Sequence, residues 1–302
     1  MPLQTPSTAL ESSLRDSIAT LAANTDTPPA IVSISDIHGY LDEARSALMT
    51  LTDHPETDPV VYSDDKGLLH WADNNYVLVF NGDLIDRGPD NEGVLELVGR
   101  LIEEAPPGRV RVTLGNHEAM LLARDQFGLA DWYCGRVDDT ERRQYCEAIR
   151  QGYVVAAYKG YEVTYAHAGA AEPYDVSTVN NSLIEAATAL TDAIGTDRDF
   201  AVQRRLPAEY PQVLGTGEGH LKGPEAGLVW LHFNHLPGDS PPQVVGHTRH
   251  DAPQTKGSVY CENVIRNNLS SDGGEAVLHE TPTELLALIR RADGSVSKQA
   301  LS

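Results

Sequence analysis

Five short clusters of polar residues in this 302-residue chain contain side chains that can bind metals and transfer protons. They are Asp36-x-His38, Gly82-Asp83-x-x-Asp86-Arg87-Gly88, Gly115-Asn116-His117-Glu118, the single His167, and Gly246-His247. Carboxylate oxygen and imidazole nitrogen together suit manganese, iron or zinc better than calcium or magnesium. In an extended chain Asp36 and His38 point the same way, so both can bind one ion.

Each cluster follows a short apolar segment that is typical of a β-strand. The predicted strands are residues 30–34, 76–80, 110–114, 162–167 and 243–245. Helical patterns follow the first three, over about 41–51, over 92–104 and from 119. Strands that alternate with helices predict an α/β fold, in which ligands bind beyond the carboxyl ends of the strands. We therefore expect the clusters to converge.

The remaining segments are less regular. Residues 59–63 and 68–71 flank a turn and predict a β-hairpin. Residues 153–158 and 162–167 are predicted as two strands around a Lys159-Gly160 turn, and 179–194 as a helix. Residues 258–297 are expected to form several short strands. Near the start, apolar residues recur at helical spacing and predict an amphipathic helix: Leu10, Leu14, Ile18 and Leu21.

The composition narrows the classes of function. The net charge is −21, with 44 acidic and 23 basic residues. No basic stripe offsets this charge, so we expect no nucleic-acid-binding face, and an anionic substrate would need local positive charge. An acidic, lysine-poor surface is also typical of proteins that work at high salt, a hypothesis that stability measured against KCl concentration would test.

We expect a cytoplasmic protein without a membrane anchor. No run of about 18 apolar residues is present, and the first 30 residues lack the pattern of a signal peptide. The three cysteines are widely spread and form neither a C-x-x-C pair nor zinc-finger spacing. Free thiols in a reducing compartment are the simplest interpretation.

The order of the motifs resembles that of the calcineurin-like metallophosphoesterases, and within them the phosphoprotein phosphatases. The similarity runs from DIHG through GDLIDRG, GNHE and YAHAG to GH, over about residues 30–250. GDLIDRGPD, GNHEAMLL and the hairpin with Trp71 are most similar to the bacterial Shewanella-like and bacteriophage-type phosphatases. The resemblance implies two central mixed β-sheets flanked by helices in a domain of residues 30–302, preceded by a helical extension of residues 1–29.

The resemblance also implies a role for each cluster. Six residues would hold two divalent ions: Asp36, His38, Asp83, Asn116, His167 and His247. Asp83 would bridge the ions, which we expect to be manganese, with iron or zinc as alternatives. Three residues would act on the phosphate: His117 as general acid, Asp86 to orient it, and Arg87 to bind the phosphoryl group.

General chemistry agrees with these implied roles. Two ions about 3.5–4 Å apart can bridge a water, lower its pKa and neutralise charge on the phosphoryl oxygens. The hydroxide so formed would attack the phosphorus, and an alkoxide leaves readily only when an acid protonates it. An arginine fork matches phosphate bidentately.

The sequence departs from the family in two places. Many metallophosphoesterases end in G-H-x-H, whereas Arg249 takes the second histidine position here, which favours the phosphoprotein phosphatase branch. That branch also uses a second phosphate-binding arginine, which we expect between His167 and the Gly246-His247 cluster. Its place stays open, and the candidates are Arg198, Arg204, Arg205 and, as a substitute, His232. Three other histidines are interpreted as surface or loop residues: His220, His235 and His250.

Three functions follow as hypotheses. The first is a metal-dependent phosphomonoesterase, in particular a serine/threonine protein phosphatase, whose partner is a phosphorylated protein or a small phosphoester. The second is a hydrolase of phosphodiesters or anhydrides, such as diadenosine tetraphosphate or a cyclic nucleotide. The third is a metal-binding regulatory module without turnover, against which the presence of His117 and Arg87 argues.

Overall fold

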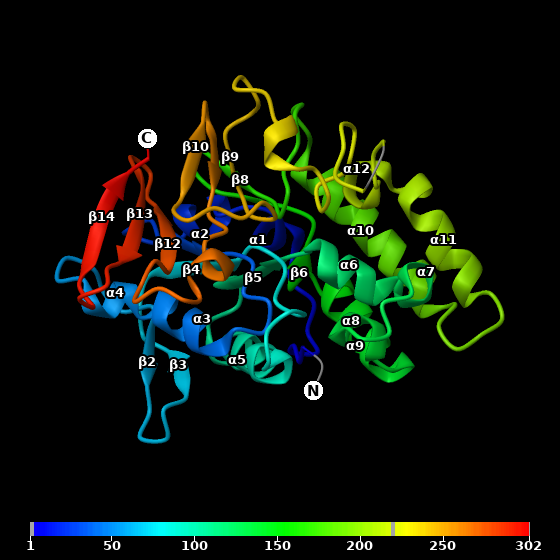
Figure 1. Ribbon diagram of the computed structural model, residues 1–302, viewed down its shortest axis with the longest axis horizontal. Helices are drawn as coiled ribbons and strands as arrows, with labels where there is room; N and C mark the ends of the chain where they lie inside the picture. The colour runs from blue at the N-terminus through cyan, green and yellow to red at the C-terminus, as the bar shows by residue number, and fades with distance from the viewer. Residues whose placement is uncertain (1–2, 219–220, 302) are drawn as a thin grey trace.

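Two β-sheets form the centre of the computed structural model, which describes residues 3–218 and 221–301 (Figure 1). The larger sheet contains, in spatial order, β14 (Val296–Ala300), β13 (Leu285–Arg290), β12 (Ala276–Glu280), β1 (Ala30–Ile34), β4 (Tyr76–Phe80), β5 (Val110–Thr113) and β6 (Val154–Val155). The second contains β10 (Gln254–Lys256), β11 (Val259–Cys261), β9 (Gln243–Val245), β8 (Thr164–Tyr165) and β7 (Tyr158–Lys159). The predicted pair of mixed sheets is confirmed.

Helices flank the sheets. Three helices lie in the chain between the parallel strands of the larger sheet: α3 (Leu41–Leu48), α4 (Thr50–Asp53) and α5 (Asn91–Glu104). A second group lies to the right in Figure 1: α6 (Asn116–Leu122), α7 (Arg124–Phe127), α8 (Tyr133–Arg136), α9 (Asp139–Arg150), α10 (Val176–Thr191), α11 (Asp199–Glu209) and α12 (Pro211–Leu214). The short elements η1 (Phe233–His235) and α13 (Ile265–Asn268) lie in later loops. Among the described residues, no helix is both long and apolar enough to span a membrane.

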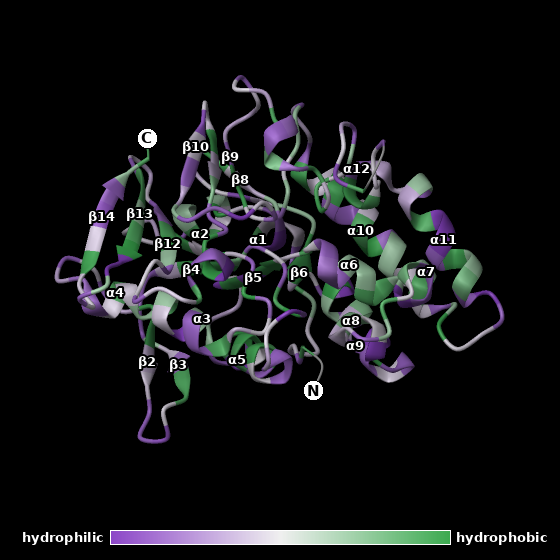
Figure 2. Ribbon diagram, in the orientation of Figure 1, coloured by the Kyte–Doolittle hydropathy of each residue, from purple (hydrophilic) through white to green (hydrophobic). Residues whose placement is uncertain are grey.

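The parallel core of the larger sheet follows from its sequence pattern. Strands β1, β4 and β5 pair in parallel, and helical crossovers connect them. Both faces of these strands are buried, which explains their continuous β-branched and aliphatic composition. Val77 and Val79 pack towards the second sheet, whereas Leu78 and Phe80 pack towards the helices. At the edge of the larger sheet farthest from β6, β14 is polar, whereas the neighbouring β13 is apolar (Figure 2).

Most predicted elements are confirmed within a residue or two. Strands 30–34, 76–80 and 243–245 match β1, β4 and β9, and the hairpin forms from β2 (Val61–Ser63) and β3 (Leu69–Trp71). It projects downward in Figure 1. The helix expected from residue 119 begins at Asn116, where the Glu118 carboxylate accepts a hydrogen bond from the Gly115 N–H at 3.0 Å. Helix α11 was not predicted.

The predicted strand 153–158 is wrong. The chain passes from β6 in the larger sheet to β7 in the second sheet, and Ala156 and Ala157 lie between them. The side chain of Asn180 replaces the missing ladder partners: its Oδ1 accepts hydrogen bonds from both alanine N–H groups at 2.8 and 3.0 Å. Its Nδ2 donates to the carbonyl of Ala157 at 3.0 Å. A buried amide on α10 therefore allows one segment to serve two sheets.

The N-terminal segment packs against the sheets. The predicted amphipathic helix is two short helices, α1 (Ser12–Asp16) and α2 (Ala19–Ala23), separated where Ser17 pairs with Lys159. Leu3 and Ile18 are buried. The boundary between residues 29 and 30 stays a prediction.

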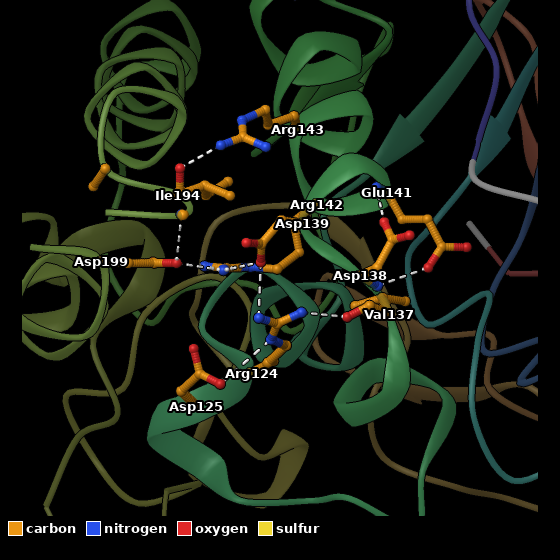
Figure 3. Close-up of polar contacts among 12 residues, drawn as sticks. Arg124, Asp125, Val137, Asp138, Asp139, Glu141, Arg142, Arg143, Ile194 and Asp199 are labelled. Atoms are coloured by element: carbon orange, nitrogen blue, oxygen red, sulfur yellow. Dashed lines mark hydrogen bonds and ion pairs between the residues drawn. The ribbon is translucent and has the colours of Figure 1, made fainter. Parts of the chain in front are cut away.

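A buried ion pair connects α9 to α11 (Figure 3). The Arg142 guanidinium donates to both carboxylate oxygens of Asp199, at 2.7 and 2.9 Å, and also to the carbonyl of Leu122 at 3.0 Å. Arg142 is fully buried. Close by, Arg124 pairs with Asp139 at 2.8 Å. Charged side chains therefore hold together the helices beside the sheet edge.

We expect Asp199→Asn to lower the free energy of unfolding by about 3 kcal/mol, because the buried Arg142 charge loses its counter-charge. Burial raises the pKa of Asp199, but hydrogen bonds from Arg142 outweigh it and lower the pKa to about 2. This stabilisation is complete above the ordinary carboxyl pKa of about 4 and is lost as the pH falls towards the folded-state value. Urea denaturation of the two proteins at successively lower pH should show the difference shrinking. The exposed Asp197→Asn is the control and should change stability by less than about 0.5 kcal/mol.

Candidate metal centre and phosphate-binding cavity

The carboxyl ends of strands from both sheets meet at one place. Asp36 and Asp83 follow β1 and β4. Asn116 lies two residues beyond the predicted strand 110–114, which contains β5. From the second sheet, His167 follows β8 and His247 follows β9. All five are buried, as are His38, Asp86 and His117. The predicted convergence of the clusters is therefore present in the fold.

The first group of potential ligands surrounds one carboxylate oxygen of Asp83. His38 Nε2 lies 3.5 Å from Asp83 Oδ2 and 3.8 Å from Asp36 Oδ1. His117 Nε2 lies 3.9 Å from the same Asp83 oxygen. The His38, Asp83 and His117 donor atoms lie within 4.8 Å of one another. Geometry alone thus places His117, as well as Asp36, beside the first position.

The second group shares Asp83 with the first. His167 Nε2 lies 3.4 Å from Asp83 Oδ2, 3.3 Å from Asn116 Oδ1 and 3.2 Å from His247 Nδ1. Asn116 Oδ1 and His247 Nδ1 are 2.8 Å apart. Two imidazole nitrogens, an amide oxygen and a carboxylate oxygen therefore point into one small volume, a donor set suited to a transition metal or zinc.

The protonation and hydrogen bonds of the histidines suit metal binding. The Nδ1 of His38 faces the carbonyl of Ile85 at 2.9 Å, and that of His167 faces the carbonyl of Asn81 at 3.0 Å. A proton on each Nδ1 leaves Nε2 free for a metal. Burial lowers the pKa of His38 to about 3 and that of His247 well below its usual range, so both rings are neutral.

Two further observations fit a pair of cations at this place. Asp36 Oδ1 is buried and has no hydrogen-bond partner among the described residues, although a bare carboxylate oxygen is costly to bury. Burial raises the pKa of Asp36 to about 6. For His167, burial lowers the pKa, but the Asp83 carboxylate outweighs it and raises the pKa to about 9. The residues present therefore fit two divalent ions, with Asp83 between them.

Backbone strain is concentrated at the same residues. Among the described residues, eight non-glycine residues have positive φ angles, and six of them are predicted site residues. The six are Asp36, His38, Asp83, Asp86, Arg87 and His247. Each such conformation costs on the order of 1–3 kcal/mol and persists when the surrounding structure enforces it. The fold thus accepts strain in order to aim these side chains inward.

Glycines permit the close approach of the two sheets. A Cβ atom on Gly246 would lie 2.2 Å from Asp36 Oδ2, and one on Gly82 would lie 2.6 Å from His167 Nδ1. Asp36 Oδ2 instead accepts a hydrogen bond from the His247 N–H at 2.9 Å. The absence of a side chain at Gly82 and Gly246 therefore lets the loops approach one another at atomic contact.

Glu118 holds in place two of the loops that carry site residues. Its fully buried carboxylate accepts hydrogen bonds from the N–H groups of Asp83, Leu84 and Gly115, at 2.9, 2.9 and 3.0 Å. Burial raises its pKa to about 7. One side chain thus joins the loop after β4 to the loop after β5, which fixes the position of Asp83.

His117 is oriented by two neighbours. Its Nδ1 contacts Asp86 Oδ2 at 2.6 Å, while Asp86 Oδ1 accepts a hydrogen bond from the Cys134 N–H at 2.9 Å. The indole of Trp132 stacks on the imidazole, with ring centroids 5.2 Å apart and an interplanar angle of 5°. The Arg87 guanidinium lies over the same indole at 3.8 Å. Trp132 therefore separates and aligns His117 and Arg87, and no sequence pattern indicated this.

A polar cavity of about 430 Å³ opens above the two ligand groups. Besides predicted site residues it is lined by Lys222, His232, Thr248, Arg249, Asn263, Arg266 and Asn267. Lys222 lies between His167 and the Gly246-His247 cluster, where the family's second phosphate-binding arginine was sought. The candidates Arg198, Arg204 and Arg205 do not line the cavity, whereas His232 does. His220 lies outside the described residues.

Residues 29–251 match the calcineurin-like phosphoesterase family, which is most of the chain. The chain belongs to this family. Its members use a centre of two metal ions, and the two groups around Asp83 are the candidate ligands here. The resemblance inferred from the motifs is therefore confirmed, and the mixed two-sheet architecture is that of the metallophosphoesterase fold.

Individual relatives are similar over shorter stretches. Shewanella-like protein phosphatase 2 of Arabidopsis thaliana is 29% identical over 120 residues, which are 35% of this chain and 28% of that protein. An asymmetrical bis(5'-nucleosyl)-tetraphosphatase of Bacillus velezensis is 37% identical over 84 residues, 28% of each chain. Both matches span little more than a quarter of the relative.

Among solved structures, a cold-active protein-tyrosine phosphatase from a psychrophilic Shewanella species shares the fold. It aligns over 96% of this chain and 85% of its own, with 19% identity and a TM-score of 0.54. The similarity concerns the fold alone.

Proposed function

We propose that this protein is a metal-dependent phosphoesterase that removes a terminal phosphoryl group from its substrate. The observation that supports this most is the sharing of Asp83 by two groups of buried potential ligands, with His38 and His167 at 3.5 and 3.4 Å from its Oδ2 atom. Asp36 and His38 would complete the first metal position, and Asn116, His167 and His247 the second. We expect manganese, with iron or zinc as alternatives.

The chain's own residues would bind the substrate and move a proton. Arg87 and Lys222 line the cavity and offer hydrogen-bond donors to the phosphoryl oxygens. His117 would hold the proton that the leaving group takes up when its bond to phosphorus breaks. The Asp86 carboxylate, 2.6 Å from the other ring nitrogen, holds the imidazole in its orientation. Bound divalent ions would supply Lewis acidity, activating water and neutralising phosphoryl charge.

Two substrate classes are supported by relatives. The Arabidopsis relative supports protein phosphatase activity, for which serine/threonine specificity is the hypothesis from the sequence, whereas the Bacillus tetraphosphatase supports anhydride cleavage. Both reactions would form a bond from a water oxygen to phosphorus and break a bond from phosphorus to an oxygen of the substrate, with the same side chains.

A metal-exchange assay tests the proposal. Protein stripped with a chelator should not hydrolyse para-nitrophenyl phosphate, and adding back Mn²⁺ should restore hydrolysis as about two ions bind per chain. The metal content is measured alongside the rate. Hydrolysis that survives complete metal removal would contradict the proposal. Two bound ions without hydrolysis of any phosphoester would favour the regulatory module instead.

A further inference from the structure

Four cationic side chains line the cavity of a strongly acidic protein: Arg87, Lys222, Arg249 and Arg266. Within residues 3–218 and 221–301, none of the four forms a hydrogen bond or an ion pair through its charged group. Arg87 contacts Trp132 only through its guanidinium face. Since 44 acidic residues compete with 23 basic ones, unpaired cations gathered at one site indicate that an anion balances them there.

Arg249 and Arg266 come from two loops that are fixed to one another. Arg249 lies in the loop after β9, and Arg266 lies on α13 after β11. The His250 N–H donates to the carbonyl of Asn263 at 2.9 Å, and Asn267 Nδ2 donates to Asp251 Oδ1, also at 2.9 Å. These two hydrogen bonds therefore hold together the two segments that carry the arginines, and the segments form one wall of the cavity.

The side chain of Asn263, which lies between the two arginines in the sequence, is a buried amide without a hydrogen-bond partner among the described residues. Asn263 lines the cavity and is only 1% exposed, yet neither its Nδ2 nor its Oδ1 makes a hydrogen bond among the described residues. Leaving a buried amide unsatisfied costs on the order of 1–3 kcal/mol. A ligand in the cavity that accepts a hydrogen bond would satisfy Nδ2 and reduce this cost, so Asn263 points to a ligand at the wall of Arg249 and Arg266.

The cavity wall also indicates what kind of anion it takes. Every described residue that lines the cavity is polar or charged. No apolar surface is available to hold a nucleobase or a hydrophobic side chain next to the phosphoryl position. Arg87 and the two metal positions would supply the positive charge that one terminal phosphoryl group needs. The charges of Arg249 and Arg266 are therefore more than a single phosphate requires.

We propose that Arg249, Arg266 and Asn263 form a second phosphate subsite, and that the substrate is a small molecule carrying an oligophosphate chain. The inference rests on the proposed function, since the terminal phosphoryl group would lie at the metal centre. The neighbouring phosphate of the leaving group would lie on the arginine wall. Hydrolysis would form a bond from a water oxygen to the terminal phosphorus and break the bond from that phosphorus to the bridging oxygen, which keeps the electron pair and takes the proton from His117.

Binding measurements separate this inference from the activity. Methylenediphosphonate, which has two phosphonate groups and cannot be hydrolysed, is titrated calorimetrically into the Mn²⁺-loaded protein, with inorganic phosphate as the single-anion comparison. We expect tighter binding of the diphosphonate. Arg266→Gln and Arg249→Gln should each lower the ratio of the two affinities by about tenfold, because each removes charge-assisted hydrogen bonds to the second anion only. Arg291→Gln, outside the cavity, should leave the ratio unchanged.

Hydrolysis then distinguishes the possible substrates. The ratio of kcat/KM for tripolyphosphate to that for para-nitrophenyl phosphate should fall about tenfold in Arg266→Gln. If para-nitrophenyl phosphate is hydrolysed but wild type shows no preference for the diphosphonate, the subsite is wrong and the proposed function stands. If a doubly phosphorylated peptide exceeds tripolyphosphate in kcat/KM, the small-molecule substrate is wrong. If no phosphoester is hydrolysed, the proposed function itself fails.

Discussion

Replacing Asp83 by asparagine should abolish metal-dependent hydrolysis, since it removes the one carboxylate that both ligand groups share. We expect the affinity for Mn²⁺ to fall by more than about 100-fold, because even changes next to metal ligands cost 10- to 100-fold. The backbone should remain folded, since an asparagine Oδ1 can still accept the His117 N–H that Asp83 Oδ1 binds at 2.9 Å. Calorimetric Mn²⁺ titration and hydrolysis of para-nitrophenyl phosphate measure the two effects.

The matched control is Asp42→Asn, which removes an equal charge from an exposed position on α3. It should bind metal and hydrolyse substrate as the wild type does. Full activity in Asp83→Asn together with lost metal binding would contradict both the metal centre and the proposed function.

Replacing His117 by asparagine should separate metal binding from proton transfer. We expect kcat for a phosphoserine peptide or another alkyl phosphate to fall by about 10²- to 10⁴-fold, because no group remains to protonate the leaving oxygen. The loss should be smaller with para-nitrophenyl phosphate, whose leaving group needs little protonation. Metal content should stay at about two ions per chain.

This variant also resolves the ambiguity of the first ligand group. His117 Nε2 lies close enough to His38 and Asp83 to bind a metal with them. If the metal content of His117→Asn falls to one ion, His117 is a ligand and its assignment as general acid is wrong. His235→Asn changes an exposed histidine outside the cavity and should alter neither the rate nor the metal content.

The positions of the site residues could be predicted because their signal is local. Asp36, Asp83 and His247 each follow a short buried strand, and parallel strands bring their carboxyl ends to one edge. A short strand rich in apolar residues and a nearby glycine can be recognised in a single sequence. The order of the clusters then led to the family.

The remainder depends on contacts between distant segments. Lys222 and Arg266 line the cavity, but no strand or motif adjacent to either indicates its direction. Trp132 reaches His117 from an irregular loop. The change of sheet between β6 and β7 depends on Asn180, more than 20 residues later. Asn263 is different: it lies two residues past β11, so the strand-end argument would have found it.

The wide spacing of the ligands has a consequence for synthesis of the protein. The His247 N–H binds Asp36 across 211 positions of sequence. At translation rates of roughly 5–20 residues per second, the segment around Asp36 waits on the order of 10–40 s until His247 is synthesised. During that interval Asp36 and Asp83, which follow β1 and β4, are present without His247 of the second sheet. A nascent chain therefore cannot bring all the proposed metal ligands together before His247 has emerged.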